Sequence, residues 1–246
     1  MLRETAYKDS SKIMTVLTGT EGKLTVSARG ALRKNSKLTS AAQLLVYSEM
    51  TLFSNRDRWT LTEARSVEQF SGLRSDVALL ALGSYFAELT EAVADEDSPN
   101  PELLPLCLNA LYALSETIKP PELIKPAFEM RLISITGLAP LISDCVICGS
   151  AAQDNAYLDL IGGNLKCSEH AVPNSAALSR TAIEAIKYII NCEPKKLFSF
   201  TLNETAQREI YQASEKYLLT QLDRKFRTLD YYNRIIDYAR KITKNT

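Results

Sequence analysis

Residues 12–28 read KIMTVLTGTEGKLTVSA, two runs rich in β-branched residues with a short turn between them. Valine, isoleucine and threonine favour strands because their branched side chains pack well on a pleated surface. The turn contains Gly22, a residue type that tolerates the reversal of the chain. The pattern predicts a β-hairpin with strands at 12–18 and 22–28.

Two more strand-like runs follow this hairpin. QLLVYSEMTLF occupies 43–53 and WTLTEAR occupies 59–65, and the turn-like stretch 55–58 separates them. A polar stretch containing glycine and serine, 29–40, joins the two pairs of strands. Short strands connected by turns predict a small barrel or sandwich in a domain spanning residues 1–74.

The apolar residues change to a helical period from about residue 75 onward. Asp76 is the expected N-cap of the first helix and Gly137 the expected C-cap of the third. The spacing predicts helical stretches at 76–94, 102–118, 122–136, 178–192 and 203–243, the last one with a break or bend. Residues 193–203 fit a loop or a short extended piece. We therefore predict an α+β protein whose helical domain covers 75–246.

The overall charge is balanced but unevenly distributed along the 246 residues. Residues 1–70 hold 11 Lys/Arg against 7 Asp/Glu, 71–144 hold 4 against 11, and 145–246 hold 14 against 11. Such asymmetry can give a basic surface for nucleic acid, or only solvated faces of different sign. The chain lacks an 18-residue apolar run and begins with a charged segment, so we expect neither a membrane span nor a signal peptide.

Four residues have the spacing of a metal site. Cys145 and Cys148 form one pair with two residues between them, and Cys167 and His170 form a second such pair after eighteen intervening residues. Each pair presents two side chains toward one point, and thiolates with an imidazole suit tetrahedral zinc. Four protein ligands leave no open position for water, so we expect one structural Zn²⁺ in a zinc module at 145–170. His170 is the only histidine in the chain.

Other interpretations of the cysteines remain open. The four residues could be reduced or buried side chains that share this spacing by chance. A Cys–His nucleophile, or a zinc- or thiol-dependent hydrolase or transferase, would need a free thiolate beside the imidazole or an open metal position. The sequence contains no G-x-S-x-G, H-E-x-x-H or Gly-rich phosphate loop. We predict no catalytic residues, and we expect Cys107 and Cys192 to be buried or half-buried thiols in a reducing cytosol.

Residues 29–37 carry four cations and no acid: Arg29, Arg33, Lys34 and Lys37. In a loop between strands these side chains could reach a phosphate backbone. A small barrel with a cationic loop is how OB-fold proteins bind single-stranded nucleic acid. A second cationic region, 216–246, has eight Lys/Arg against three Asp, including Arg224, Lys225 and Arg227. It is either a further DNA contact or a solvated helical face.

Short motifs along the chain match those of a known protein family. The N-terminal matches are LR at 2–3, YKDSSKI at 7–13, LT at 17–18, EGK at 21–23 and ARGALRKNSKL at 28–38. The central matches are FEMRL at 128–132, GLAP at 137–140, CVICG at 145–149 and the glycine pair at 162–163. Together they cover most of the chain, and in their residues and order they resemble the RecO family of bacterial recombination mediators.

The resemblance implies an N-terminal OB-fold barrel, a helical domain and an inserted zinc module. It also implies binding of single- and double-stranded DNA, strand annealing, recombinase loading in the RecF pathway, and partnership with RecR and single-strand binding protein in the cytoplasm at the nucleoid. The resemblance implies no active site. A scaffold that binds only protein partners is the alternative to a DNA-binding mediator. Two departures stand out: His170 replaces the fourth cysteine of many members, and the Leu2-Arg3 pair comes early. We therefore expect a short first strand, and either a natural start upstream of Met1, which we favour, or a partly open barrel.

Overall fold

The hairpin predicted over residues 12–28 is present in the computed structural model. Its strands are β2 (Ser11–Leu17) and β3 (Lys23–Ala28), which pair antiparallel with Met14 opposite Val26. Both of these side chains are fully buried. The structure describes residues 1–56, 58–96, 98–151 and 156–244, so Asp57 of the predicted turn lies outside the described residues.

The chain divides into two compact units. The first comprises residues 1–117 together with 226–246, and the second comprises 118–225. The domain boundary predicted at residue 74 lies inside the first unit, and it stays a prediction.

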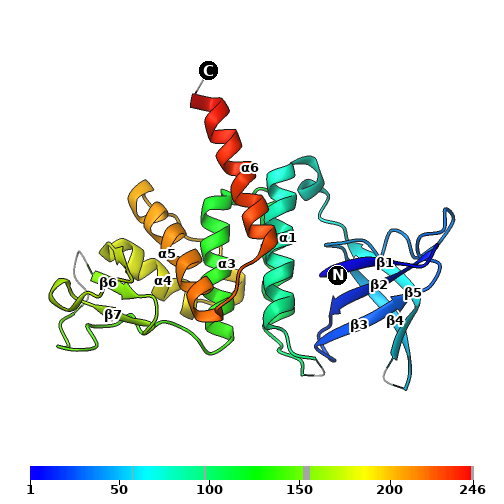
Figure 1. Cartoon of the computed structure of the whole chain (residues 1–246), viewed down its shortest axis with the longest axis horizontal. Helices are drawn as coiled ribbons and strands as arrows, with labels where there is room; N and C mark the ends of the chain where they lie inside the picture. The colour runs from blue at the N-terminus through cyan, green and yellow to red at the C-terminus, as the bar shows by residue number, and fades with distance from the viewer. Residues whose placement is uncertain (57, 97, 152–155, 245–246) are drawn as a thin grey trace. The chain divides into compact units, whose positions relative to one another are not determined.

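A five-stranded sheet forms the N-terminal part of the first unit (Figure 1). Its order is β1-β2-β3-β5-β4, and β3 and β5 run parallel while the other neighbours are antiparallel. The three remaining strands are β1 (Arg3–Tyr7), β4 (Tyr47–Asn55) and β5 (Arg58–Glu68). The alternation of buried and exposed residues in β2 and β3 directs Met14, Val16, Leu24 and Val26 into one apolar cluster.

The third predicted strand begins later than expected. We predicted a strand from residue 43, but β4 starts at Tyr47. Leu45 has a φ of +60°, a left-handed conformation that an extended strand cannot contain. Its N–H donates instead to the carbonyl of Met1 at 3.1 Å. The backbone conformation at Leu45 therefore ends the β3–β4 connection and sets the start of β4.

The helices of the first unit are η1 (Ser71–Ser75), α1 (Val77–Val93), α2 (Leu103–Ser115) and α6 (Arg227–Lys244). The predicted N-cap of α1 is confirmed, since the Asp76 carboxylate accepts from the N–H groups of Ala78 and Leu79. Cys107 is buried on α2, as expected. Both α2 and α6 pack against α1.

The second unit contains α3 (Pro121–Ile135), α4 (Arg180–Asn191), η3 (Pro194–Lys196) and α5 (Glu204–Leu222). Its small sheet has the order β7-β6-β8, formed by β6 (Ala156–Asp159), β7 (Asn164–Lys166) and β8 (Ser175–Leu178). Gly137 closes α3 as predicted, with a φ of +83°. The break or bend expected within 203–243 is a full break, because Asp223 has a φ of +44° and ends α5.

The predicted α+β class is confirmed by an N-terminal sheet followed by a mainly helical part. Among the described residues, no helix combines the length and the apolar character that crossing a bilayer requires.

Candidate functional site

The structure brings together the four residues that the sequence predicts as metal ligands. The donor atoms of Cys145, Cys148, Cys167 and His170 all lie within 4.8 Å of one another. His170 Nδ1 is 3.2 Å from Cys167 Sγ and 3.7 Å from Cys145 Sγ, and the sulfurs of Cys148 and Cys167 are 3.8 Å apart. A disulfide would need about 2.05 Å, so these two cysteines are separate thiols.

The first ligand pair lies on a tight turn held by the backbone. The N–H of Gly149 donates to the carbonyl of Cys145 at 2.8 Å, and Gly149 has a φ of +69°. The N–H of Val146 donates to the carbonyl of Leu165, which lies on β7, two residues before Cys167 of the second pair. These bonds bring Cys145 and Cys148 to the second pair, from which eighteen intervening residues separate them in the chain.

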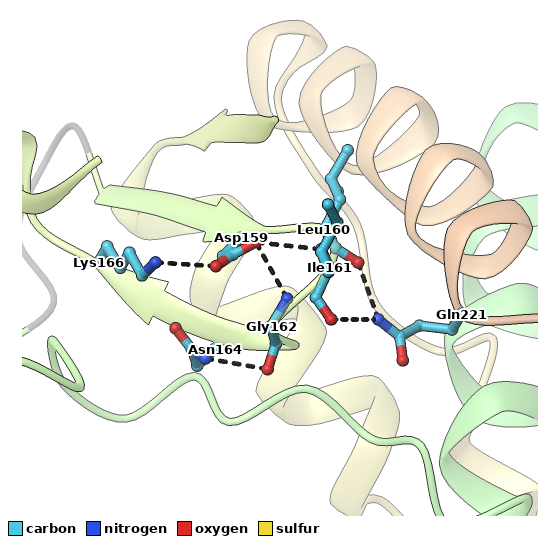
Figure 2. Close-up of polar contacts among 7 residues, drawn as sticks. All are labelled: Asp159, Leu160, Ile161, Gly162, Asn164, Lys166 and Gln221. Carbon is cyan, nitrogen blue, oxygen red and sulfur yellow. Dashed lines mark hydrogen bonds and ion pairs between the residues drawn. The ribbon is translucent and has the colours of Figure 1, made fainter. Parts of the chain in front are cut away.

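The second pair lies at the end of β7 and on the short helix η2 (Ser168–His170). The β6–β7 hairpin that leads to it is held by Asp159, whose carboxylate accepts from Ile161 N–H, Gly162 N–H and Lys166 Nζ at 3.0, 3.0 and 2.8 Å (Figure 2). Gln221 on α5 donates to the carbonyls of Leu160 and Ile161, which anchors the turn to that helix.

Sequence reasoning did not single out Asp159, Lys166 and Gln221 as supports of the cluster. The short spacing from Asp159 to the glycines is the signal of an Asx-type turn and could have identified Asp159. Gln221 has no comparable signal, because it lies about 60 residues from the carbonyls that it contacts.

The electrostatics of the cluster favour a thiolate at Cys145. The backbone N–H groups of Cys148 and Cys167, with a smaller contribution from Ile147, lower the pKa of the Cys145 thiol to about 5, although burial opposes them. Hydrogen bonds to a charged form stabilise that form. Because the thiolate is the form that binds metals, Cys145 is prepared to act as a ligand at neutral pH.

The spacing of the donor atoms fits a single tetrahedral ion. Sulfur ligands about 2.3 Å from a tetrahedral zinc lie about 3.8 Å apart, which equals the separation of the Cys148 and Cys167 sulfurs. Three sulfurs and one imidazole nitrogen complete a four-ligand set. The Cys3His cluster can therefore hold one metal ion.

The other predicted site residues lie on exposed segments. Arg29, Arg33, Lys34 and Lys37 are exposed on the β3–β4 connection of the first unit. Arg224 and Lys225 are exposed at the end of the second unit, and Arg227 is exposed at the start of α6. Within the described ranges, none of the four cations on the β3–β4 connection forms an ion pair with a carboxylate.

Comparisons with known proteins find matches along most of the chain. Residues 1–70 match the model of the family "Recombination protein O N terminal", and residues 74–230 match "Recombination protein O C terminal". The chain is 33% identical over 233 residues to the DNA repair protein RecO of Acetivibrio thermocellus, covering 94% of this chain and 93% of the relative. It is 30% identical over 237 residues to RecO of Symbiobacterium thermophilum, with the same shares covered.

The fold and the site define an α+β protein with a cluster of four potential metal ligands and an exposed cationic connection between two strands. The chain belongs to the RecO family of DNA repair proteins.

Proposed function

We propose that this protein is a non-enzymatic mediator that binds single- and double-stranded DNA, anneals complementary strands and promotes recombinase loading in the RecF pathway. The observation that carries the proposal is the set of exposed cations at 29–37, which form no ion pair with a carboxylate among the described residues, in a chain that belongs to a family of DNA repair proteins. As a mediator it would work in the cytoplasm at the nucleoid, with RecR and single-strand binding protein as partners.

The DNA-binding domain in this proposal is an OB fold at residues 1–74. The strand order β1-β2-β3-β5-β4 and the parallel β3–β5 pair support it, since the OB fold is a five-stranded, partly open Greek-key barrel. The Met1 amine donates to the carbonyl of Val46, and Leu45 N–H donates to the carbonyl of Met1. These bonds bring the start of β4 beside the start of β1 and so support closure of the sheet.

The β3–β4 connection is ordered enough to present its cations. Its backbone is tied to the sheet by Leu32 N–H, which donates to the carbonyl of Ser10, and is tied internally by Thr39 Oγ1, which donates to the carbonyl of Ala31. Ala31 is fully buried against the sheet core. Because the connection is anchored at Ala31 while the cations around it are exposed, their positive charge is available to phosphates.

Annealing would follow from neutralisation of charge. Two single strands repel each other through their phosphates until cations lie between them, and bound cations release condensed counterions. The exposed residues Arg224, Lys225 and Arg227 form the second set of proposed DNA contacts.

The metal in this proposal is one Zn²⁺ held by Cys145, Cys148, Cys167 and His170. When bound, zinc would supply folding energy to the zinc module and no chemistry, because four protein ligands leave no position for a substrate or water. The fourth ligand removes the only histidine from any Cys–His catalytic pair.

The test is reversal of charge at Arg33 and Lys34 to glutamate, with DNA affinity measured by fluorescence anisotropy across a salt series. Loss of two phosphate contacts should weaken binding to single-stranded DNA and flatten the slope of log K against log salt by about 1.4. The matched control is Arg180→Glu with Lys195→Glu, two exposed cations of the second unit whose reversal changes the net charge equally.

An unchanged affinity and slope in the Arg33/Lys34 variant would show that the loop does not contact DNA. Equal weakening in the control would show a general effect of net charge. If the wild-type protein does not bind DNA even at low salt, a scaffold that binds only proteins replaces the proposal.

A further inference from the structure

Helix α6 carries cations and tyrosines in alternation along one face. The members of this line, called here the α6 stripe, are Arg227, Tyr231, Arg234, Tyr238 and Lys241. They are separated by four, three, four and three residues, and positions with this spacing lie on one face of an α-helix. The line therefore spans four turns of α6 with a cation at each end.

The α6 stripe faces solvent. The side chain of Tyr231 is 49% exposed and that of Tyr238 is 69% exposed, and the three cations of the stripe are exposed. The buried face of α6 is different, since Leu229 and Tyr232 are only 3% and 2% exposed. The helix packs against α1 near its start, and all of residues 237–242 are exposed. The two tyrosines of the stripe are thus not needed to fill the core.

We propose that the α6 stripe binds single-stranded DNA, with the tyrosine rings stacked on bases and the three cations paired with phosphates. Base–aromatic stacking combined with a cationic track is the usual way in which proteins bind single strands without sequence preference. The inference rests on the proposed DNA-binding function, and it adds a contact surface and its preferred form of DNA.

Stacking on the two tyrosine rings of the stripe favours single-stranded DNA over duplex DNA. Tyr231 and Tyr238 are seven residues apart, which corresponds to about 10.5 Å along the helix axis. A tyrosine ring can stack only on a base whose face is free, and duplex bases are already stacked on their neighbours. Duplex DNA can therefore use only the cations of the stripe.

Charge argues against a second copy of this chain as the occupant. Pairing of two α6 stripes along their length would bring cations opposite cations, because the exposed acids of the helix, Asp230 and Asp237, lie beside the stripe and not on it. A polyanion has the complementary charge. The match to the C-terminal family model ends at residue 230, so four of the five stripe residues lie beyond the matched region.

The experiment compares three variants of the full-length protein for binding to a labelled single-stranded oligonucleotide and to a duplex of the same length. Tyr231→Ala with Tyr238→Ala removes both rings, and the double change to phenylalanine keeps them. The control is Tyr112→Ala, because Tyr112 on α2 is also 49% exposed but lies outside the stripe. Circular dichroism checks that each variant keeps the wild-type helix content.

Loss of the two rings should lower affinity for the single strand by about five-fold for each tyrosine or more, because stacking contributes about 1–3 kcal/mol per base by alanine substitution. Duplex affinity should stay within about two-fold and the salt slope should not change, since no phosphate contact is lost. The phenylalanine variant and Tyr112→Ala should bind as the wild type does.

Unchanged affinity of the alanine variant for the single strand would overturn the inference, as would an equal loss in the phenylalanine variant or an equal loss for duplex. The Arg33/Lys34 reversal separates this inference from the loop assignment. If that variant binds normally while the alanine variant is weakened, the loop assignment fails and the stripe stands. The opposite pair of results overturns the stripe alone.

Discussion

Replacement of Asp159 by asparagine tests what holds the β6–β7 turn beside the cysteine cluster. In the wild type, Asp159 accepts the N–H groups of Ile161 and Gly162 on one oxygen and the Lys166 ammonium on the other (Figure 2). Asparagine keeps an oxygen acceptor for the two N–H groups but carries no charge. Lys166 then loses its carboxylate partner, since it forms no other ion pair within the described ranges.

The burial of this pair sets the size of the effect. The side chains of Lys166 and Asp159 are each 11% exposed, so water cannot replace the lost interaction fully. A hydrogen bond to a charged group contributes about 1.5–3 kcal/mol and a neutral one about 1 kcal/mol, and an unpaired ammonium adds a further penalty. We expect the hairpin to lose about 2 kcal/mol of local stability, which is about 30-fold in its opening equilibrium.

Amide hydrogen exchange of residues 156–167, followed by mass spectrometry, measures this opening directly. We expect exchange about 30-fold faster in Asp159→Asn than in the wild type. The control is Glu184→Gln, which breaks the Lys187–Glu184 pair. Its N–O distance of 2.9 Å nearly equals the 2.8 Å of the Lys166–Asp159 pair, but its side chains are 33% and 60% exposed. An exposed pair contributes little, so the control should exchange at the wild-type rate.

The difference in exchange rate between the wild type and Asp159→Asn should depend on pH, and the direction of this dependence follows from the pKa of Asp159. Partial burial raises the pKa of Asp159, but the Gly162 N–H, Lys166 and the Ile161 N–H outweigh it and hold the pKa below the usual carboxyl range. Such a group contributes stability above the unfolded carboxyl pKa, and this stability is lost as pH falls through the lowered folded pKa. The advantage of the wild type over Asp159→Asn should therefore shrink below about pH 4. Equal exchange of the two proteins at pH 7, or equal acceleration in Glu184→Gln, would refute the reasoning.

Three further predictions concern the second unit. Gly163→Ala places a side chain at a φ of +64° with its Cβ 2.8 Å from Tyr217 Oη, whereas Gly137 has a φ of +83° and open space around it. Both alanine variants should lose about 1 kcal/mol of folding stability, because alanine is strained at a positive φ, and Gly163→Ala should lose about 1 kcal/mol more from the clash with Tyr217. Equal melting temperatures of the two variants would contradict the clash. Lys125→Met leaves the Glu129 carboxylate, 0% exposed, without the ammonium that lies 2.8 Å away. Urea unfolding should show a loss of about 3–5 kcal/mol, and a loss under about 1 kcal/mol would count against a buried ion pair. Removal of the proposed zinc by a chelator should accelerate hydrogen exchange across residues 145–170 and leave the N-terminal sheet protected. Protection of 145–170 that survives loss of the metal would rule out a structural role.

Local sequence patterns were enough to predict most of the helices and strands. The alternation in 12–28 and the cap residues Asp76 and Gly137 are short-range signals, because each depends on neighbours within four residues. The wrong prediction of a strand at 43–46 has a long-range cause instead. Those residues have strand-like side chains, but the backbone of Leu45 turns to bond Met1, 44 residues earlier in the chain.

The candidate metal site also combines residues that the sequence predicts with supporting contacts that it does not. The spacing of the cysteines identified all four potential ligands, because zinc needs a small set of donor types at short spacing. The supports of the cluster could not be predicted to the same extent. Gln221 reaches the β6–β7 turn from α5, and Val146 bonds Leu165 across the intervening hairpin.

The α6 stripe shows why the tertiary structure was needed for the surface. The sequence contains the spacing from Arg227 to Lys241, but the position of the break at Asp223 and the face that α6 buries were not evident from it. Only packing against α1 decides that Tyr232 is core while Tyr231 and Tyr238 are exposed.

The α+β class, the four potential metal ligands and the cationic stretch at 29–37 could be predicted from the amino-acid sequence, since they depend on residue type and short spacing. The order β1-β2-β3-β5-β4, the convergence of the four potential ligands within 4.8 Å and the exposed face of α6 are known only from the folded chain. Those features depend on pairing and packing between residues far apart in the chain, for which a single sequence carries no local signal.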